Sequence, residues 1–453
     1  MAQARTRALP AEYWPRRTHW AAHVPAAACG VTLLGRLVEW SGRGGLLVDE
    51  SGAVRVRCLG TAGAGRSVAA GDIVAARGAV QAGALEAVAI DRLVPGRPAL
   101  AADSDWAAFA ERGGVRARNL RVRAQVLAAV REFFAARGFL EVETPIFSIG
   151  TGHEAHIEFF RTEFRTGRRR LRGVLIPSPE HHMKRLLGAG FERLYQMGRC
   201  FRNGERSVVH NPEFTLLEWY RAFATYAEVM QDVEDLVRAV AGRVRGASVL
   251  VRGGRSIDVG PAWPRVTVES AFRQHAGVDL RQCRDAAALC RAAAAAGCRS
   301  VRPDDTFEDA FHKLLVERVE PALAPLGAWF LQDYPVELGA LARRKPGDPR
   351  WAERAEAYVG GVELANGFGE LNDVAEQRRR FRAEAAKRRA AGRSPMPADR
   401  AFLRMLAAGM PPAAGMALGV DRLVMLCVGA TTLDDVLAFP LGRAAADGGG
   451  ATL

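Results

Sequence analysis

Along the first hundred residues, hydrophobic positions fall in short runs that Gly and polar turns interrupt. Runs of this length and spacing predict short β-strands, and five of them in succession predict a small β-barrel. The predicted strands are Val31–Val38, Gly45–Val48, Val54–Leu59, Ile73–Val80 and Leu85–Leu93.

A long amphipathic helix is predicted next, after a linker rich in Ala and Pro at residues 95–105. Its apolar residues recur at helical spacing, and they are Leu120, Val126, Leu127, Val130, Phe133 and Phe134. The helix should stop near Gly138, and we expect a strand at Phe139–Val142 that ends at Thr144-Pro145. The stretch 222–350 is rich in Ala and Arg, and we expect it to be mostly helical.

The mixture of helices and strands predicts an α+β fold, and 453 residues are too many for one small core. We therefore expect a barrel domain with an irregular N-terminus at residues 1–100 and a larger domain at residues 101–443. The small, Gly-rich end, residues 444–453, is expected to be a flexible tail.

Composition and charge narrow the class of protein only slightly. About half of the residues are hydrophobic and a quarter charged, as in an ordinary soluble protein. No apolar leader or membrane-length run occurs, so we expect a cytoplasmic location. The net charge of +13 fits a nucleic-acid or acidic-protein partner, or else an Arg-rich bias spread over the whole chain.

The cysteines do not indicate a disulfide framework or a metal centre. Seven is an odd number in a long chain. Three of them, Cys283, Cys290 and Cys298, follow His275 at gaps that match no usual zinc pattern. We expect no metal site in that segment.

Two arginines stand in settings that suggest chemistry. Arg202 leads, after a polar loop, into His-Asn-Pro-Glu-Phe and then Leu-Leu-Glu-Trp-Tyr, which predicts a hairpin with a guanidinium at its base. Arg422 stands in Ala-Leu-Gly-Val-Asp-Arg, just inside a predicted helix that follows a Gly-bearing strand. A guanidinium stays charged and binds phosphate oxygens with two parallel hydrogen bonds, so both are candidate phosphate ligands.

These two segments resemble motifs 2 and 3 of class II aminoacyl-tRNA synthetases, in the lysine-specific branch. The predicted helix, strand and terminal Pro145 resemble motif 1, which forms the dimer interface of that family. The barrel is similar to the oligonucleotide-binding (OB) fold that precedes lysyl synthetases. The resemblance implies a core of antiparallel sheet flanked by helices, a homodimer, and ATP-dependent activation of a lysine-like amino acid.

The resemblance also assigns an ATP site. Arg202 would bind the α-phosphate and the reacting carboxylate, Arg422 the γ-phosphate, and Phe214 would stack on adenine. Glu356 and Glu363 would hold Mg²⁺, since the Gly360-Gly361 turn between them should make them converge. The full set of expected ATP contacts is Arg202, Asn203, Glu205, His210, Asn211, Phe214, Glu363, Leu364, Gly419 and Arg422.

A pocket for a lysine side chain should offer a carboxylate at its end and an apolar wall for the methylene stem. By resemblance, Glu370 meets the side-chain ammonium and Phe368 forms the wall. The expected amino-acid contacts are Ser178, Glu180, Glu218, Tyr220, Asn366, Phe368, Glu370 and Ala417. One departure from the family is Gly204, which shifts the carboxylate of Glu205 one place along; a bulged loop would compensate.

Two branches of the family compete for the assignment. Lysyl-tRNA synthetases charge tRNA(Lys), whereas elongation factor P–(R)-β-lysine ligases modify a lysine of elongation factor P. Ala417, where synthetases usually have Gly, favours the ligases, as does the single aromatic, Trp40, of residues 30–95. The barrel itself and the segment at 330–335 favour the synthetases. A catalytically weakened regulator is a third interpretation, disfavoured because both arginines and the carboxylates are present.

Overall fold

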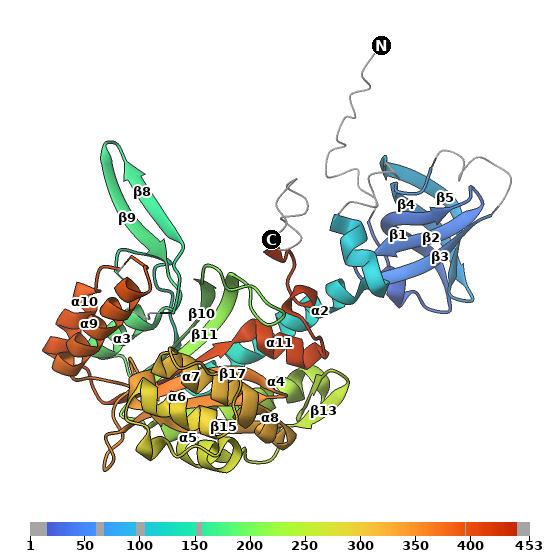
Figure 1. The fold of residues 1–453 in the computed structure, drawn as a ribbon. Coiled ribbons are helices and arrows are strands. Elements are labelled where there is room, and N and C mark those ends of the chain that lie inside the picture. Colours follow the sequence, from blue (N-terminus) through green and yellow to red (C-terminus); the bar gives the residue numbers. More distant parts are fainter. Residues whose placement is uncertain (1–15, 60–67, 97–104, 151–155, 395, 442–453) are drawn as a thin grey trace. The chain divides into compact units, whose positions relative to one another are not determined.

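The structure is a computed structural model that describes residues 16–59, 68–96, 105–150, 156–394 and 396–441. The chain folds into two compact units, residues 1–118 and 119–453. Helices and antiparallel strands are mixed in the larger unit (Figure 1), so the predicted α+β class is confirmed. The predicted linker and tail fall largely or wholly outside the described residues.

All five strands predicted for the N-terminal unit are present. They are β1 (Ala27–Trp40), β2 (Gly44–Asp49), β3 (Gly52–Cys58), β4 (Ile73–Gln81) and β5 (Ala84–Val94). They close into a barrel in the order β1-β2-β3-β5-β4, with only β3 and β5 parallel. Alternate side chains such as Val31, Leu33 and Leu47 fill the interior, as the period-2 pattern requires.

Helix α2 (Asp105–Ala135) ends close to where the sequence predicted. Val126, Val130 and Phe134 on its C-terminal half are fully buried, which accounts for the helical spacing of apolar residues. The strand expected after it is only two residues long, β6 (Leu140–Glu141), and it pairs in parallel with β10 (Arg193–Phe201).

The larger unit is built on one eight-stranded sheet in the order β14-β15-β16-β17-β18-β11-β10-β6. Its six inner strands are antiparallel, and the outermost strand on each side pairs in parallel. The remaining strands of this sheet are β10 (Arg193–Phe201), β11 (Glu213–Ala222), β14 (Arg265–Thr267), β15 (Ala328–Pro335), β16 (Trp351–Val359), β17 (Val362–Gly369) and β18 (Ala413–Gly419).

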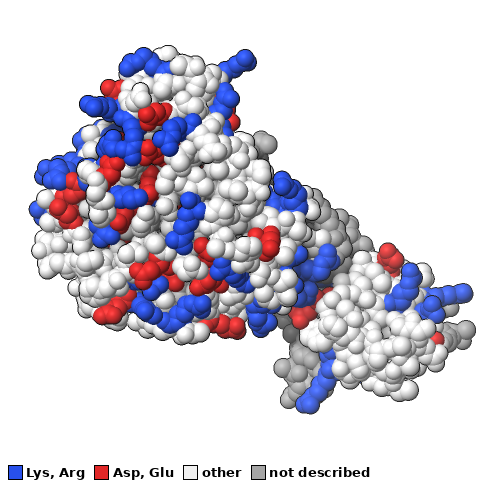
Figure 2. Space-filling model, turned by 90° about the horizontal axis from the view of Figure 1, so that it is seen from below, with Lys and Arg blue, Asp and Glu red and all other residues white. Residues whose placement is uncertain are grey.

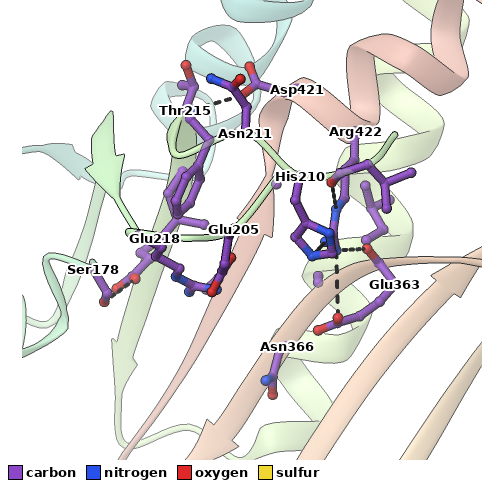
Figure 3. Close-up of a pocket in the computed structure, with 18 of the residues that line it drawn as sticks. Ser178, Glu205, His210, Asn211, Thr215, Glu218, Glu363, Asn366, Asp421 and Arg422 are labelled. Atoms are coloured by element: carbon purple, nitrogen blue, oxygen red, sulfur yellow. Dashed lines mark hydrogen bonds and ion pairs between the residues drawn. The ribbon is translucent and has the colours of Figure 1, made fainter. Parts of the chain in front are cut away.

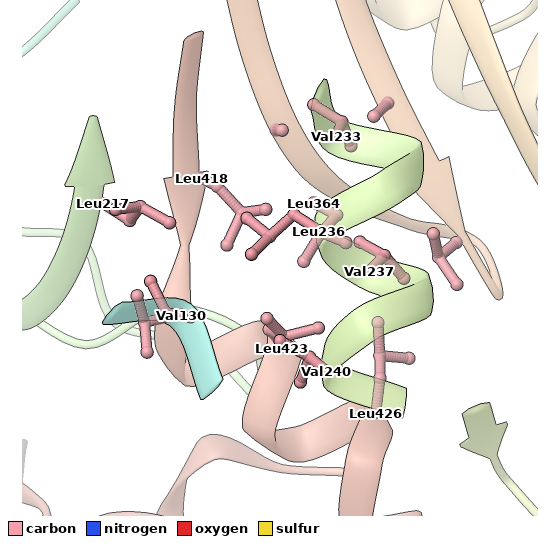
Figure 4. Close-up of a cluster of buried hydrophobic side chains, with 14 of the residues drawn as sticks. Val130, Leu217, Val233, Leu236, Val237, Val240, Leu364, Leu418, Leu423 and Leu426 are labelled. Carbon is pink, nitrogen blue, oxygen red and sulfur yellow. The ribbon is translucent and has the colours of Figure 1, made fainter. Parts of the chain in front are cut away.

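One face of this sheet is covered by α4 (Tyr226–Arg245), α11 (Val420–Val428) and the end of α2. Leu364 on β17 and Leu418 on β18 meet the apolar stripe of α4 there, and Leu217 on β11 belongs to the same cluster on the far side of Leu418 (Figure 4). Because strand residues alternate between faces, their neighbours in sequence point to the other side of the sheet, where the candidate site lies.

The stretch 222–350 is less helical than predicted. Besides its helices it holds β14, β15 and a hairpin of β12 (Val249–Arg252) and β13 (Arg255–Asp258). Strand β15 is buried almost throughout and begins with a short apolar run at residues 328–331, a pattern that short buried strands share with helices. Because the surrounding sequence is rich in Ala and Arg, the strand was predicted as part of a helical stretch.

The other elements pack around the sheet. Hairpin β8 (Arg161–Thr166) and β9 (Arg169–Leu175) projects from the larger unit and pairs with β7 (Phe147–Ser148) (Figure 1). The remaining helices are α3 (Glu180–Gly188), α5 (Val268–Ala271), α6 (Ala286–Ala295), α7 (Phe307–Leu314), α8 (Glu320–Leu323), α9 (Val374–Ala390) and α10 (Arg400–Ala408). Single turns are η2 (Ala21–His23), η3 (Phe272–Ala276), η4 (Leu280–Gln282), η5 (Leu315–Val319), η6 (Ala324–Leu326), η7 (Val336–Leu338) and η8 (Leu433–Asp435). No helix in the described ranges is both long and apolar enough to cross a membrane.

Candidate active site

A cavity lies on the face of the central sheet opposite α4. Its floor is a row of directly paired residues, Glu218 on β11, Ala417 on β18 and Asn366 on β17. Direct cross-strand partners point to the same side of a sheet, so pairing alone brings these three side chains together. The hairpin loop between β10 and β11 and the start of α11 form the walls (Figure 3).

Most of the residues predicted for the site line this cavity. They are Ser178, Glu180, Arg202, Glu205, His210, Asn211, Phe214, Glu218, Glu363, Leu364, Asn366, Phe368, Ala417, Gly419 and Arg422. Four predicted residues do not line it: Asn203, Tyr220, Glu356 and Glu370. The cavity also has lining residues that the sequence did not single out: Val209, Thr215, Leu216, Leu341, Ala365, Asp421 and Leu433.

The guanidinium of Arg422 is held by strand β17 and by the loop between β10 and β11. Nη1 donates to the backbone oxygen of Glu363 at 2.5 Å, and Nε donates to that of Val209 at 3.2 Å. Nη2 lies 2.7 Å from Nε2 of His210, and the Glu363 carboxylate is 3.6 Å away. Arg422 is therefore fixed at the cavity wall by groups that need not move when an anion binds.

His210 is neutral in this arrangement. Burial lowers its pKa, and the neighbouring positive charge of Arg422 lowers it further. Because a guanidinium has no acceptor, Nε2 of His210 accepts the hydrogen bond from Arg422. The proton of the ring then sits on Nδ1, which lies 2.8 Å from the hydroxyl of Ser207.

Arg202 lies at the base of the predicted hairpin and faces the cavity. Its guanidinium stands over the ring of Phe214, 5.2 Å from the centroid. Nη1 is 3.8 Å from the carboxylate of Glu205, and the loop reaches that point because Gly204 has a φ of +78°. The buried Nε of Arg202 has no hydrogen-bond partner among the described residues, as would be expected of a ligand-binding group.

Asp421 is a positioning residue that the motif contained but to which the sequence assigned no role. It accepts from Nη1 of Arg123 on α2 at 2.6 Å and from the backbone N–H of Thr215 on β11 at 2.9 Å. Arg123 in turn donates to the Thr215 hydroxyl at 2.7 Å. This network ties α2, β11 and α11 together directly beside Arg422. The position of Asp421 directly before the motif 3 arginine was the feature of the sequence that could have indicated this role.

The two glutamates predicted to hold Mg²⁺ lie on neighbouring strands and share a face. The two-residue turn Gly360-Gly361 joins β16 to β17, so residues seven apart on the hairpin point the same way, as predicted. A bulge at Leu364 then shifts the register, and Asn366 pairs directly with Glu356. Asn366 Oδ1, which has no hydrogen-bond partner among the described residues, belongs to this same face.

Only one of these glutamates opens to the cavity. The side chain of Glu363 is 39% exposed. Its partial burial still raises the pKa of the carboxyl group, and repulsion from Glu356 raises that pKa further. Both carboxylate oxygens of Glu356 are engaged: one accepts from the hydroxyls of Tyr334 and Tyr358 at 2.5 and 2.8 Å, the other from Arg354 at 2.6 Å. The described residues hold no group of three or more His, Cys, Asp or Glu placed for a metal.

The opposite side of the cavity is acidic. Glu218 accepts from the hydroxyls of Ser178 and Tyr220 at 2.6 and 2.8 Å. Burial, and then repulsion from Glu180, raises the pKa of Glu218 to about 7. Figure 3 shows Glu218 and Ser178 on the side of the cavity away from His210 and Arg422, with Glu205 between them.

A buried lysine stands behind this acidic side. The ammonium of Lys184 on α3 pairs with both Glu180 and Glu370. Burial opposes its charge, yet the two carboxylates raise its pKa above the usual value. Burial raises the pKa of Glu370 to about 8 despite this partner. The cluster therefore contains three carboxyl groups, with Glu218, against one ammonium.

Gly415 on β18 explains how Tyr220 and Glu370 fit at this depth. A Cβ atom at this position would lie 2.3 Å from Cε1 of Tyr220 and 2.6 Å from Oε1 of Glu370. Such separations are far inside van der Waals contact, so only glycine leaves room for both groups. The sequence did not single out this residue.

The fold and the residue set identify the family. The model of class II tRNA synthetases (D, K and N) matches residues 107–443, which is most of the chain. The chain belongs to this family, and the predicted resemblance is confirmed.

Relatives of two kinds, both named ligases, are similar to this chain. A lysine–tRNA ligase of Pelotomaculum thermopropionicum is 39% identical over 70% of this chain and 62% of that protein. That of Moorella thermoacetica is 40% identical over 71% and 64%. An elongation factor P–(R)-β-lysine ligase of Vibrio cholerae serotype O1 is 39% identical over 76% of this chain and 99% of that protein. The chain thus spans less than two thirds of the two lysine–tRNA ligases, and the identities are similar in both groups.

Proposed function

We propose that this protein uses ATP to activate lysine or (R)-β-lysine and transfers the acyl group to a lysine side chain of elongation factor P. The observation that carries the proposal is the polarity of one cavity. Glu218 and Ser178 lie on one side, Arg422 and His210 lie on the other, and Glu205, which Arg202 contacts, lies between them. This order fits an amino acid whose ammonium groups lie on the acidic side and a nucleoside triphosphate that lies on the basic side. The carboxylate of the amino acid would then meet the triphosphate at the centre.

The basic side is suited to ATP. Arg422 is fixed by backbone carbonyls for the γ-phosphate, and the unpartnered Nε of Arg202 is available for the α-phosphate and the reacting carboxylate. Phe214 offers a ring face for adenine. Asn203, Asn211, Leu364 and Gly419 complete the ATP contacts that the family resemblance implies.

Mg²⁺ fits this site only in part. Glu363 opens to the cavity, whereas Glu356 is already saturated by two tyrosines and Arg354. Mg²⁺ usually takes several ligands from water and phosphate, so one or two carboxylates suffice. Glu363 would hold the ion directly and Glu356 would support it from behind; when bound, the ion would neutralise charge on the phosphate oxygens.

The acidic side is suited to a substrate with two ammonium groups. Glu180, Glu218 and Glu370 face one internal cation, Lys184, so the cluster has room for further positive charge. Glu180 and Glu218 face the cavity itself and would receive an ammonium directly. Phe368 lines the wall beside them, where methylene groups would pack. Glu370 lies one layer deeper and is proposed as the carboxylate for the far ammonium.

The chemistry follows from this placement. A carboxylate oxygen of the amino acid attacks the α-phosphorus, the bond from that phosphorus to the bridging oxygen breaks, and pyrophosphate leaves. The nucleophile is already ionised, so positioning and charge neutralisation supply the rate. In the second step an amine of the acceptor attacks the carbonyl carbon, AMP leaves, and the amine loses a proton.

Two observations favour elongation factor P over tRNA(Lys) as the acceptor. The methyl group of Ala417 stands in the floor of the cavity between Glu218 and Asn366, where it alters the space beside the amino acid. The barrel strands contain a single aromatic residue, Trp40, which packs partly against the barrel core, so they do not present a row of aromatic rings for base stacking. We propose that the barrel, although its strand order suits an OB fold, does not read an anticodon.

A transfer assay tests this proposal. The purified protein, ATP and Mg²⁺ would be incubated with labelled lysine or (R)-β-lysine and offered elongation factor P and tRNA(Lys) in separate reactions. We expect label on the protein acceptor and none on tRNA. Label on tRNA alone would establish a lysyl-tRNA synthetase and reject our interpretation of Ala417. The oligomeric state, proposed to be a homodimer, can be measured on the same sample by light scattering.

A further inference from the structure

The hairpin β8–β9 carries a concentration of positive charge that composition does not explain. Residues 161–175 contain six arginines and one glutamate, a net charge of +5, whereas the whole chain carries +13. The six arginines are Arg161, Arg165, Arg168, Arg169, Arg170 and Arg172, and all of them are exposed. A bias spread evenly over the chain would not place so much of its net charge in fifteen residues.

The positive charge of the hairpin is only partly neutralised within the hairpin itself. Arg165 pairs directly with Arg170 across the two strands, and like charges in that position are destabilising. The single acid, Glu163, lies within 4 Å of Arg165, Arg170 and Arg172, so one carboxylate serves three guanidiniums. Glu163 pairs directly with Arg172 across the strands, but one carboxylate leaves most of the positive charge exposed, and this excess points to a binding role.

The hairpin also exposes apolar side chains. Phe164 and Leu171 are cross-strand partners, 56% and 45% exposed, on the face opposite that of Glu163. An aromatic residue flanked by arginines is the composition of the energetically important part of a protein–protein interface. A surface meant only for phosphates would not need this apolar pair.

The two ends of the hairpin are fastened beside Arg202. The backbone oxygen of Ile176, just after β9, accepts from the N–H of Phe201 at 2.9 Å. Before β8, the oxygen of Glu158 accepts from the N–H of Asn203 at 2.9 Å. Two residues past Ile176, Ser178 lines the cavity. A molecule held by the hairpin would therefore be held next to the place where the acyl group forms.

A second basic element adjoins the hairpin. Helix α9 holds seven basic residues and two acidic ones, and Arg161 donates to the backbone oxygen of Ser394, shortly after that helix. In Figure 2, blue side chains, interspersed with red ones, occupy the side of the larger unit where Figure 1 shows α9. The positive surface thus extends beyond the hairpin itself.

We infer that the β8–β9 hairpin is a docking element for an acidic surface of the acceptor protein, with Phe164 and Leu171 packing at the centre of the contact. This inference rests on the proposed function, since it takes the acceptor to be a protein. It adds the element that recognises the acceptor, which the cavity residues do not define.

The test separates the two steps of the reaction. The double variant Arg165→Ser/Arg170→Ser removes two arginines that are 68% and 64% exposed. Its matched control, Arg243→Ser/Arg273→Ser, removes two that are 59% and 65% exposed on other elements of the same unit. ATP–pyrophosphate exchange reports activation without an acceptor, and labelling of elongation factor P reports transfer.

We expect the hairpin variant to exchange pyrophosphate at the wild-type rate, which also shows that it is folded. Its KM for elongation factor P should rise about tenfold and depend less on salt, because exposed charges act mainly on encounter. Phe164→Ser should raise the same KM severalfold without changing the salt dependence. The control variant should behave as wild type.

Two results would overturn the inference, and they differ in what else they reject. If the wild-type protein labels elongation factor P and the hairpin variant does so with an unchanged KM, the hairpin is not the docking element and the proposed function stands. If the wild-type protein labels tRNA(Lys) and not elongation factor P, the proposed acceptor and the docking inference both fail.

Discussion

The two sides of the cavity carry opposite charge, one basic and the other acidic. On the basic side, Arg422 is immobilised by backbone oxygens, and Arg202, which lines the cavity, has a buried Nε with no hydrogen-bond partner among the described residues. On the acidic side, Glu218 is buried with a raised pKa, and a lysine of the chain itself already neutralises part of the cluster. A ligand must therefore bring anionic charge to one side and cationic charge to the other, and this orients it before any chemistry occurs.

Removal of Arg422 should have the largest effect. Arg422→Ala deletes a fixed donor for developing phosphate charge, so we expect kcat/KM for ATP–pyrophosphate exchange to fall about 10²–10³-fold. Arg404→Ala on α10 removes an exposed arginine instead and should leave exchange unchanged. An Arg422 variant with normal exchange would show that the basic side does not bind the triphosphate.

Gly415→Ala should damage the acidic side specifically. The added methyl group must displace the buried ring of Tyr220, and overpacking of this kind typically costs about 1–3 kcal/mol. We expect KM for the amino acid to rise about 10–100-fold, with a much smaller change in KM for ATP. Gly198→Ala on β10 is the matched control, because its nearest neighbour would be 3.4 Å from the new atom. Equal effects on both substrates would contradict a division of the cavity into two sides.

Binding of the amino acid should become tighter as pH rises from 6 to 8. Burial and Glu180 raise the pKa of Glu218 to about 7, so the group is largely protonated at pH 6 and largely ionised at pH 8. An ammonium prefers the ionised form, which gives an increase in affinity of about tenfold over this range. Calorimetric titrations at several pH values measure it. Glu218→Gln should bind weakly at every pH, without this slope; a slope that persists in the variant would assign the titration to another group.

Ala417→Gly should have the smallest effect, because one methyl group is worth about 1–3 kcal/mol of discrimination at most. We expect the ratio of kcat/KM for (R)-β-lysine to that for lysine to fall by about tenfold, with little change in the KM for ATP. The two amino acids serve as controls for each other in one exchange assay. An unchanged ratio would remove Ala417 as evidence for the acceptor branch.

The sequence predicted those features that depend on local pattern. The five barrel strands, the end of α2 and the convergence of Glu356 with Glu363 follow from periodicity and from a two-residue turn. The motif residues Arg202 and Arg422 line one cavity because the motifs specify the strands and helix that carry them.

Other features depend on contacts between segments that are distant in the chain, and these were not predictable. The network from Asp421 to Arg123 joins residues almost 300 positions apart. The pairing of Lys184 with Glu370, which withdraws Glu370 from the cavity lining, depends on how α3 meets the end of β17. The role of Gly415 becomes visible only when Tyr220 and Glu370 are placed together. Strand β15 was missed because its apolar run fits a helix as well as a strand.

The most direct measurement is ATP–pyrophosphate exchange by the wild-type protein with lysine, (R)-β-lysine and norleucine, which lacks the side-chain ammonium. When buried carboxylates of a site bind a substrate ammonium, an analogue that lacks this ammonium leaves them unpaired. Its kcat/KM is then expected to be about 10⁴-fold lower. We predict exchange with one or both lysine-type amino acids and almost none with norleucine. Equal exchange with norleucine would show that the acidic side of the cavity does not select the substrate.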